Sequence, residues 1–301
     1  MTPTCFIREN CVWTHTRNPA TGVALQGHIE CLVFYSRHAQ KLPHLEHKAE
    51  TIVAAAYGGH IACLQHLLTT ERVDRSRDRV AMATAAGHLE CLKYITGRMR
   101  CGHIDKGVLY AAAVGGHTEC VLYLVVDKNV WMTPIIDTIV RMGHTDMLRR
   151  LYNARGHTTD WTNAVRRATS ACTLAARRGD RKMLSLLCDV GFDWDIGETC
   201  AAAAESGSLE CLTYLYENGC SWDENTCTAA ARGGHLQCLE YAHENGCPWD
   251  GRTVYEAASH GHVKCVAYAL KNGCMYRDEG ACNYIIMSSI TTLTDMGLCH
   301  L

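Results

Sequence analysis

Two kinds of short segment alternate along most of the chain, one rich in alanine and one with a regular pattern of larger apolar residues. The alanine-rich kind, as in 199–204 and 226–231, has strong helix propensity. The other kind, as in the segments starting at Leu209 and Leu236, has apolar residues at i, i+2, i+3, i+5 and i+6 and ends at Asn-Gly, a frequent helix stop. The pattern predicts pairs of short helices joined by tight turns.

A Gly-His dipeptide, or a close variant, separates the two segments of each pair and recurs nine times. The glycines are Gly27, Gly59, Gly87, Gly116, Gly143, Gly179, Gly207, Gly234 and Gly261. Their spacing is 27 to 29 residues, except for 32 before Gly59 and 36 before Gly179, which indicates insertions at those two places. Because a single helix pair cannot bury its own apolar face, neighbouring pairs must stack. We therefore expect an all-α solenoid of about nine to ten short helix-turn-helix repeats.

The unit Ala-Ala-x-x-Gly-His-x-x-Cys-Leu-x-Tyr-Leu-x-x-x-Gly-Cys is similar to the ankyrin repeat, and the resemblance covers roughly residues 9–287. The usual ankyrin repeat has about 33 residues, so the hairpin fingers are expected to be trimmed to tight turns. The Thr-Pro-Leu-His opening of the first helix is also absent. The resemblance implies a non-catalytic scaffold that binds a partner protein on the concave solenoid surface.

The short, cysteine-rich form of the repeat, with Asn-Gly-Cys-Pro-Trp-Asp at 245–250, resembles ankyrin-repeat proteins of giant amoeba viruses such as pandoraviruses. This narrower resemblance implies a viral factor that acts on host proteins. For the organisation of the chain we expect a degenerate N-terminal capping repeat at 1–26, a repeat array at 27–287 with an insertion around 154–170, and a C-terminal cap at 288–301.

Aromatic residues keep the same phase as the repeat. Tryptophan stands 15 residues after the glycine in four units and tyrosine in a fifth: Trp131, Trp194, Trp222, Trp249 and Tyr276. An exposed ladder for stacking nucleotide bases would need interleaved basic residues, whereas aspartate follows three of these tryptophans. We therefore expect the aromatic residues to join adjacent repeats.

Histidine and cysteine also recur once per unit, in Gly-His-x-x-Cys. A tetrahedral metal site needs four converging ligands, and equivalent residues in stacked repeats lie roughly 10 Å apart, so we expect neither a metal nor a cofactor. The cysteines are interpreted as small core residues. The histidines are expected to hydrogen-bond the backbone of a neighbouring turn. Nucleotide-binding and nucleophile motifs are absent, which favours a protein without enzymatic activity.

Overall composition is that of a folded chain with a packed core, because 48% of the residues are hydrophobic and 20% are charged. The net charge of -2 is unevenly distributed. Residues 141–182 carry ten basic and three acidic residues, or +7, whereas residues 183–301 carry five basic and sixteen acidic residues, or -11. The basic segment 141–182 contains the 36-residue spacing, so its insertion is a candidate site. Two alternatives remain, a solvated surface and a nucleic-acid or phosphate-ligand site.

The residues expected to contact a partner are the variable ones just before the glycines, together with two arginines of the insertion. They are Tyr57, Arg141, Met142, Arg166, Arg167, Arg177, Arg178, Glu205, Ser206, Arg232, Ser259 and His260. The partner is expected to be a protein, a host protein if the chain is viral, rather than a small-molecule substrate, nucleic acid or membrane. No signal peptide or transmembrane segment is recognised, so we expect a cytoplasmic location, in the host cytoplasm if viral.

Overall fold

The computed structural model describes residues 19–38, 48–69, 87–98, 104, 106–130, 135–168, 170–195 and 197–275. Within these ranges all regular secondary structure is helical and there is no β-strand, which confirms the expected all-α repeat fold. The chain divides into two compact units, residues 1–135 and 136–301. Residues 1–18 of the cap expected at 1–26, the whole cap expected at 288–301, and the aromatic residues Trp131 and Tyr276 lie outside the described ranges.

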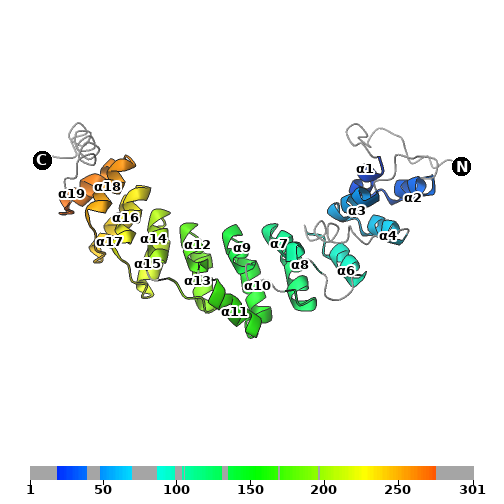
Figure 1. Ribbon diagram of the computed structural model, residues 1–301, viewed down its shortest axis with the longest axis horizontal. Helices are drawn as coiled ribbons and strands as arrows, with labels where there is room; N and C mark the ends of the chain where they lie inside the picture. The colour runs from blue at the N-terminus through cyan, green and yellow to red at the C-terminus, as the bar shows by residue number, and fades with distance from the viewer. Residues whose placement is uncertain are drawn as a thin grey trace. The chain divides into compact units, whose positions relative to one another are not determined.

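In the first unit, the first helices of the repeats form one row and the second helices another (Figure 1). The first helices are α1 (Pro19–Gln26), α3 (Lys48–Tyr57) and α7 (Lys106–Val114). The second helices are α2 (Ile29–His38), α4 (Ile61–Thr69), α6 (Leu89–Arg98) and α8 (Thr118–Leu122), which continues as the π-helix η3 (Tyr123–Asp127). α1 packs on α3, and the second helices contact one another in chain order.

The second unit repeats this plan with one additional helix. Its first helices are α9 (Ile135–Met142, of which Ile135 ends the first unit), α12 (Ala171–Arg177), α14 (Glu198–Glu205), α16 (Glu224–Gly233) and α18 (Gly251–Ser259). Its second helices are α10 (Thr145–Arg155), α13 (Arg181–Asp189), α15 (Leu209–Glu217), α17 (Leu236–Glu244) and α19 (Val263–Lys271). From α12 to α18 each first helix packs on the next, and from α10 to α19 each second helix does the same.

The small residues of the first helices explain how closely these helices stack. In α16 the whole run from Thr226 to Ala231 is buried. Alanine, threonine and cysteine leave room for the neighbouring backbones, while the second helices bury larger residues such as Leu239, each contributing about 1.5–3 kcal/mol. Asp223 accepts a hydrogen bond from the backbone N–H of Asn225 at 3.0 Å and so caps α16 at its N-terminus.

Threonine hydroxyls also join neighbouring first helices. Thr173 and Thr199 are 3.1 Å apart between α12 and α14, and Thr228 and Thr253 are 3.3 Å apart between α16 and α18. Between α14 and α16 this contact is missing, since Ala201 holds the position of Thr173 and Thr228. The hydroxyl of Thr226 is buried there without a hydrogen-bond partner.

The expectation that aromatic residues join adjacent repeats is confirmed at two positions. Trp222 stacks on Tyr216 of its own repeat at 4.1 Å and meets the edge of Tyr241 of the next repeat at 6.1 Å. Trp249 stacks on His243 at 3.7 Å and contacts Tyr268 of the following repeat at 6.0 Å. These rings are used for packing between repeats.

Most of the described cysteines are buried, as expected of small core residues. Those at the fourth position after the glycine are buried, except for Cys31, which is half-buried: Cys63, Cys91, Cys120, Cys211, Cys238 and Cys265. The three that follow the Asn-Gly stop are buried as well: Cys220, Cys247 and Cys274. Burial raises the pKa of Cys238 and Cys265 to about 11, which keeps both thiols protonated at neutral pH.

The additional helix, α11 (Thr159–Arg167), lies between α10 and α12, where the 36-residue spacing occurs. Thr158 caps its N-terminus by accepting a hydrogen bond from the backbone N–H of Trp161 at 3.3 Å. The Trp161 ring is buried and contacts Tyr152 of α10 at 5.4 Å and Phe192 at 6.0 Å. The extra residues therefore form a helix that one aromatic side chain attaches to the stack.

Candidate interaction surface

The glycine turns determine where the variable residues stand. Gly207, Gly234 and Gly261 have φ between 74° and 76°, a left-handed conformation that ends each first helix and starts the second. The residues just before each glycine therefore come together at the C-terminal end of a first helix. Because first helices stack on one another, these ends line up along one side of the row.

In several repeats the histidine after the glycine joins the repeat to the preceding one. His60 donates from Nε2 to the carbonyl oxygen of Leu25 at 3.0 Å, and His88 donates to that of Tyr57 at 2.8 Å. The predicted hydrogen bond to a neighbouring turn is thus confirmed for these two histidines. The ring also packs against the glycine of the preceding repeat, so that a Cβ atom at Gly234 would collide with the His262 ring.

Two repeats of the second unit lack this histidine, having Asp180 or Ser208 in its place. In both, the residue immediately before the glycine makes the bond instead. Arg178 donates from Nη1 to the carbonyl oxygen of Arg141 at 2.6 Å, and Ser206 donates to that of Ala176 at 3.0 Å. Two of the twelve predicted partner-binding residues therefore also hold neighbouring repeats together.

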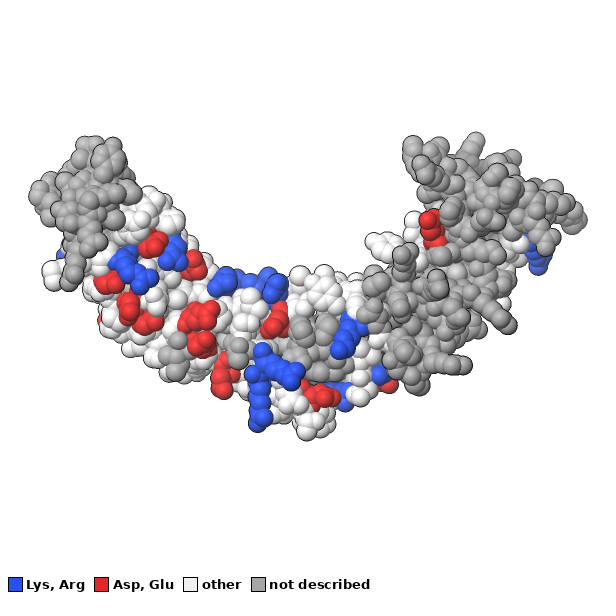
Figure 2. Space-filling model, in the orientation of Figure 1, with Lys and Arg blue, Asp and Glu red and all other residues white. Residues whose placement is uncertain are grey.

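Three of the predicted residues form what we call the arginine cluster: Arg141 at the end of α9, and Arg177 and Arg178 at the end of α12 (Figure 2). All three side chains are exposed, and Met142 beside them is 38% exposed. In the part of the chain that the structure describes, none of the three lies within ion-pair distance of a carboxylate.

Asp137 is the acidic group that Arg141 influences, from one turn earlier on α9. Burial raises the pKa of Asp137, and the positive charge of Arg141 opposes this rise. One carboxylate oxygen of Asp137 is buried without a hydrogen-bond partner. This carboxylate therefore lowers the positive potential of the arginine cluster without pairing with it.

The two arginines predicted on the insertion do not join the arginine cluster. Arg166 and Arg167 are exposed at the C-terminal end of α11, before α12 begins, whereas Arg177 and Arg178 stand at the other end of α12. Figure 2 accordingly shows basic side chains in separate places over α11 and over the ends of α9 and α12. The five arginines that the sequence assigned to a partner in the basic segment are thus divided between two surfaces.

The predicted residues of the last three first helices form a paired network instead. Arg232 contacts Glu256 at 3.1 Å and Glu205 at 3.7 Å, one in the following repeat and one in the preceding repeat. Glu256 is also 3.7 Å from His260, and Ser259 hydrogen-bonds His260 at 3.1 Å. The hydrogen bond to Glu256 raises the pKa of Arg232. Glu205 and Arg232, whose charges the sequence assigned to a partner, are thus paired within the chain.

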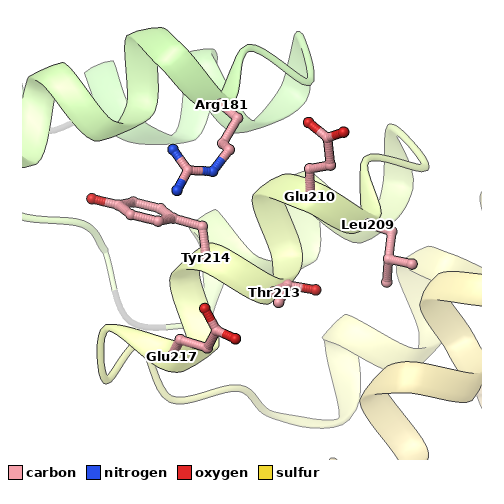
Figure 3. Close-up of a pocket in the computed structure, with 6 residues that line it drawn as sticks. All are labelled: Arg181, Leu209, Glu210, Thr213, Tyr214 and Glu217. Carbon is pink, nitrogen blue, oxygen red and sulfur yellow. The ribbon is translucent and has the colours of Figure 1, made fainter.

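Tyr57, the remaining predicted residue, belongs to the first unit, where it ends α3 and is 64% exposed. The arginine cluster belongs to the other unit. Sequence reasoning missed a groove of about 430 Å³ on the second helices of the second unit (Figure 3). The Arg181 guanidinium lies 4.4 Å from the centre of the Tyr214 ring there, and Glu210 and Glu217 of α15 flank that ring. The sequence does contain a signal for this groove, because Glu210, Tyr214 and Glu217 are spaced four and three residues apart and so share one face of α15.

Neither a metal centre nor a membrane span is found among the described residues. No group of three or more histidine, cysteine, aspartate or glutamate side chains is placed to hold a metal ion. No helix in these ranges has the length and apolar character that crossing a membrane requires.

Residues 200–279 match the family model for ankyrin repeats, in three copies. This segment consists of ankyrin repeats. A comparison with curated proteins found no match. The matched ankyrin repeats include the whole paired network of Glu205, Arg232, Glu256 and His260, whereas the arginine cluster lies in the repeats that precede them.

Ankyrin repeats indicate a protein-protein interaction scaffold, and proteins built from them are generally non-catalytic. Stacked repeats present a long surface built from equivalent positions, on which the side chains can differ from repeat to repeat. In this chain, the arginine cluster and the paired network are two such stretches of surface with different electrostatic properties.

Proposed function

We propose that the protein is a non-catalytic scaffold that binds an acidic segment of a partner protein at the arginine cluster. The observation that carries the proposal is the absence of a carboxylate partner for three neighbouring exposed arginines within the described residues. Guanidinium groups bind carboxylates through charge-assisted, often bidentate hydrogen bonds. The exposed part of Met142 supplies apolar contact beside them.

The position of the arginine cluster supports binding by the row of first-helix ends, which corresponds to the concave side expected from the resemblance. The short cysteine-rich repeats support a viral protein whose partner is a host protein in the cytoplasm. Arg178 is less free than Arg141 and Arg177, because its hydrogen bond to the carbonyl oxygen of Arg141 fixes it. We expect this bond to orient the guanidinium group before the partner binds, which reduces the entropy lost on binding.

The competing proposal, nucleic-acid binding by residues 141–182, has less support. Proteins that bind single strands combine a continuous basic groove with exposed aromatic rings. Here the five predicted arginines of the segment are divided between α11 and the ends of α9 and α12 (Figure 2), and Trp161 is only 2% exposed. A sequence-independent phosphate contact would also make binding fall steeply with salt.

The test is affinity capture from amoeba lysate with the full chain and two variants that each lose two charges. Arg141→Gln with Arg177→Gln alters the arginine cluster but keeps the structural bond of Arg178. Arg166→Gln with Arg167→Gln removes the same charge from α11. We expect to capture a discrete acidic protein, and nuclease treatment should not abolish the capture. This protein should bind the α11 variant, whereas its affinity for the cluster variant should be at least about tenfold weaker.

Two results would contradict the proposal. If nuclease abolished capture, residues 141–182 would be a nucleic-acid site. If the captured protein bound the cluster variant as tightly as the wild type, the partner surface would lie elsewhere, and the groove on α15 would be the next surface to alter.

A further inference from the structure

Three successive repeats of the second unit each contain a pair of cysteines, of which all but the half-buried Cys188 are buried. One cysteine of each pair lies near the start of a first helix, and the other lies late in the second helix or just after the Asn-Gly stop. The pairs are Cys172 with Cys188, Cys200 with Cys220, and Cys227 with Cys247. The next repeat has Val254 in place of the first cysteine, opposite Cys274.

The pair in the α14–α15 repeat has its two sulfurs in direct contact. The Cys200 thiol donates to the Cys220 sulfur at 2.9 Å, and the two side chains are 0% and 1% exposed. The thiols of the neighbouring pairs also hydrogen-bond each other, and the Cys247 thiol in addition donates to the carbonyl oxygen of Asp223 at 3.2 Å. The Cys200 and Cys220 sulfurs need only a small further approach to form a disulfide, in which the sulfurs are about 2.0 Å apart.

The hydrogen bond between the two sulfurs also shifts the pKa values of the two thiols in opposite directions. Accepting the hydrogen bond lowers the pKa of Cys220, and donating it raises the pKa of Cys200. A thiolate is the attacking species in disulfide exchange. Cys220 is therefore suited to attack first, and Cys200 is placed to complete the bond.

We propose that Cys200 and Cys220 are a reversible disulfide modification site, oxidised by a small-molecule disulfide such as oxidised glutathione. The Cys220 thiolate attacks one sulfur of the oxidant and releases one thiolate, which leaves a mixed disulfide on Cys220. Cys200 then loses its proton, attacks the Cys220 sulfur and releases the second thiolate. The protein loses two electrons and two protons, and one molecule of oxidant becomes two thiols.

The position of this site gives the oxidation a structural effect. Cys200 is the third residue of α14, and Cys220 follows the glycine that ends α15. The bond would link the start and the end of one repeat through a loop of about twenty residues, which constrains the unfolded chain more than the folded one. Since both thiols are buried, reaction requires a local opening of the turn at 218–223, where Ser221 is exposed.

The experiment is oxidation of the folded full chain with oxidised glutathione, followed by alkylation of the remaining thiols and digestion after glutamate. That digestion places Cys200 in peptide 199–205, Cys211 in 211–217 and Cys220 in 218–224. We expect mass spectrometry to find peptides 199–205 and 218–224 linked, with Cys211 alkylated. Dithiothreitol should separate them, and the oxidised protein should unfold at a higher temperature than the reduced one.

Cys200→Val is the matched variant, because Val254 occupies the equivalent position opposite Cys274. It should not form the linked peptides, and oxidation should leave its unfolding temperature unchanged. The proposal is wrong if peptides 199–205 and 218–224 both remain alkylated in the wild type after oxidation. It is equally wrong if the linked peptides match the mixture formed by the urea-unfolded chain, because the native contact would then not select the pair.

Discussion

The ends of α9 and α12 and the ends of α14, α16 and α18 follow the same structural plan but differ in how their charges are used. At α14, α16 and α18, Arg232 lies between Glu205 and Glu256 in an ion-paired row. At α9 and α12, Arg141 and Arg177 have no ion-paired carboxylate among the described residues. One stretch satisfies its charges within the chain, whereas the other leaves them to solvent or to a partner.

The difference also involves how the repeats are joined. Where histidine follows the glycine, its ring contacts the preceding repeat and leaves the variable residues free to pair with one another, as Arg232 does. Where Asp180 replaces the histidine, Arg178 takes over the contact to the preceding repeat. Where the histidine is missing, the residue immediately before the glycine therefore also joins the repeats, as Arg178 does, whereas its neighbour Arg177 makes no such bond.

Substitution of the turn glycines tests this difference with the largest expected effect. Gly234 and Gly143 share nearly the same φ, 74° and 77°, so alanine costs about 1–2 kcal/mol of backbone strain at each. At Gly234 the new methyl group would also collide with the His262 ring, adding about 1–3 kcal/mol, whereas at Gly143 it meets the flexible Arg178 side chain. We expect Gly234→Ala to lower the free energy of unfolding more than Gly143→Ala does, measured by urea titration.

Gly143→Ala has a second consequence that serves as its control. A Cβ atom there would lie 2.6 Å from the Arg178 guanidinium group, which must move and lose its bond to the Arg141 carbonyl. Binding of an acidic partner should weaken in this variant. Equal destabilisation by the two alanine substitutions would show that histidine and arginine pack against the glycines in the same way.

The adjacent arginines of α12 provide the next test. Removing the Arg178 side chain deletes the hydrogen bond to the preceding repeat and should lower the free energy of unfolding by about 1 kcal/mol. Arg177 makes no such bond, so Arg177→Ala should change it by less than about 0.5 kcal/mol. Urea titration of Arg178→Ala and Arg177→Ala measures both free-energy changes. Ser206→Ala is a second test, because Ser206 also makes the hydrogen bond to the preceding repeat where the histidine is missing. Identical midpoints for the two arginine variants would remove any structural role from Arg178.

The repeat period, the helix pairs and the buried cysteines could be predicted from the sequence, because each depends on residues close together in the chain. The hydrogen bonds that Arg178 and Ser206 make to the preceding repeat could not be predicted. Arg178 and the Arg141 carbonyl are 37 residues apart, and their bond arises only because the histidine is missing. For the same reason, charge counting placed Arg167 and Arg177 in one basic segment. The structure separates them because the length of α12 lies between them.

A buried hydroxyl offers a third test, this time by stabilisation. Thr226 of α16 lacks the partner that Thr199 and Thr253 have, because Ala201 stands where the other first helices carry threonine. Ala201→Thr should supply that hydroxyl and raise the free energy of unfolding by about 1 kcal/mol. Ala201→Val adds the same bulk without a hydroxyl and is the matched control in the urea titration. If valine stabilised as much as threonine, the gain would come from packing.

The smallest effect concerns the charge beneath the arginine cluster. Burial raises the pKa of Asp137 above its ordinary value of 3.8, so the folded chain holds this proton more tightly than the unfolded chain. The resulting contribution to stability is fully present below the ordinary pKa and is lost as the pH rises through the raised pKa. Asp137→Asn should therefore be more stable than the wild type at pH 7, with the difference shrinking toward pH 4 in urea titrations.

The same substitution connects the pH dependence to binding. Removing the carboxylate also raises the positive potential around Arg141, so an acidic partner should bind Asp137→Asn more tightly at neutral pH. Arg141→Gln should act in the opposite direction, because the arginine opposes the rise in the pKa of Asp137. In Arg141→Gln the loss of stability between pH 4 and pH 7 should be steeper, and the acidic partner should bind more weakly. If Asp137→Asn gained stability at pH 7 without binding the acidic partner more tightly, the charge of the arginine cluster would not determine the affinity.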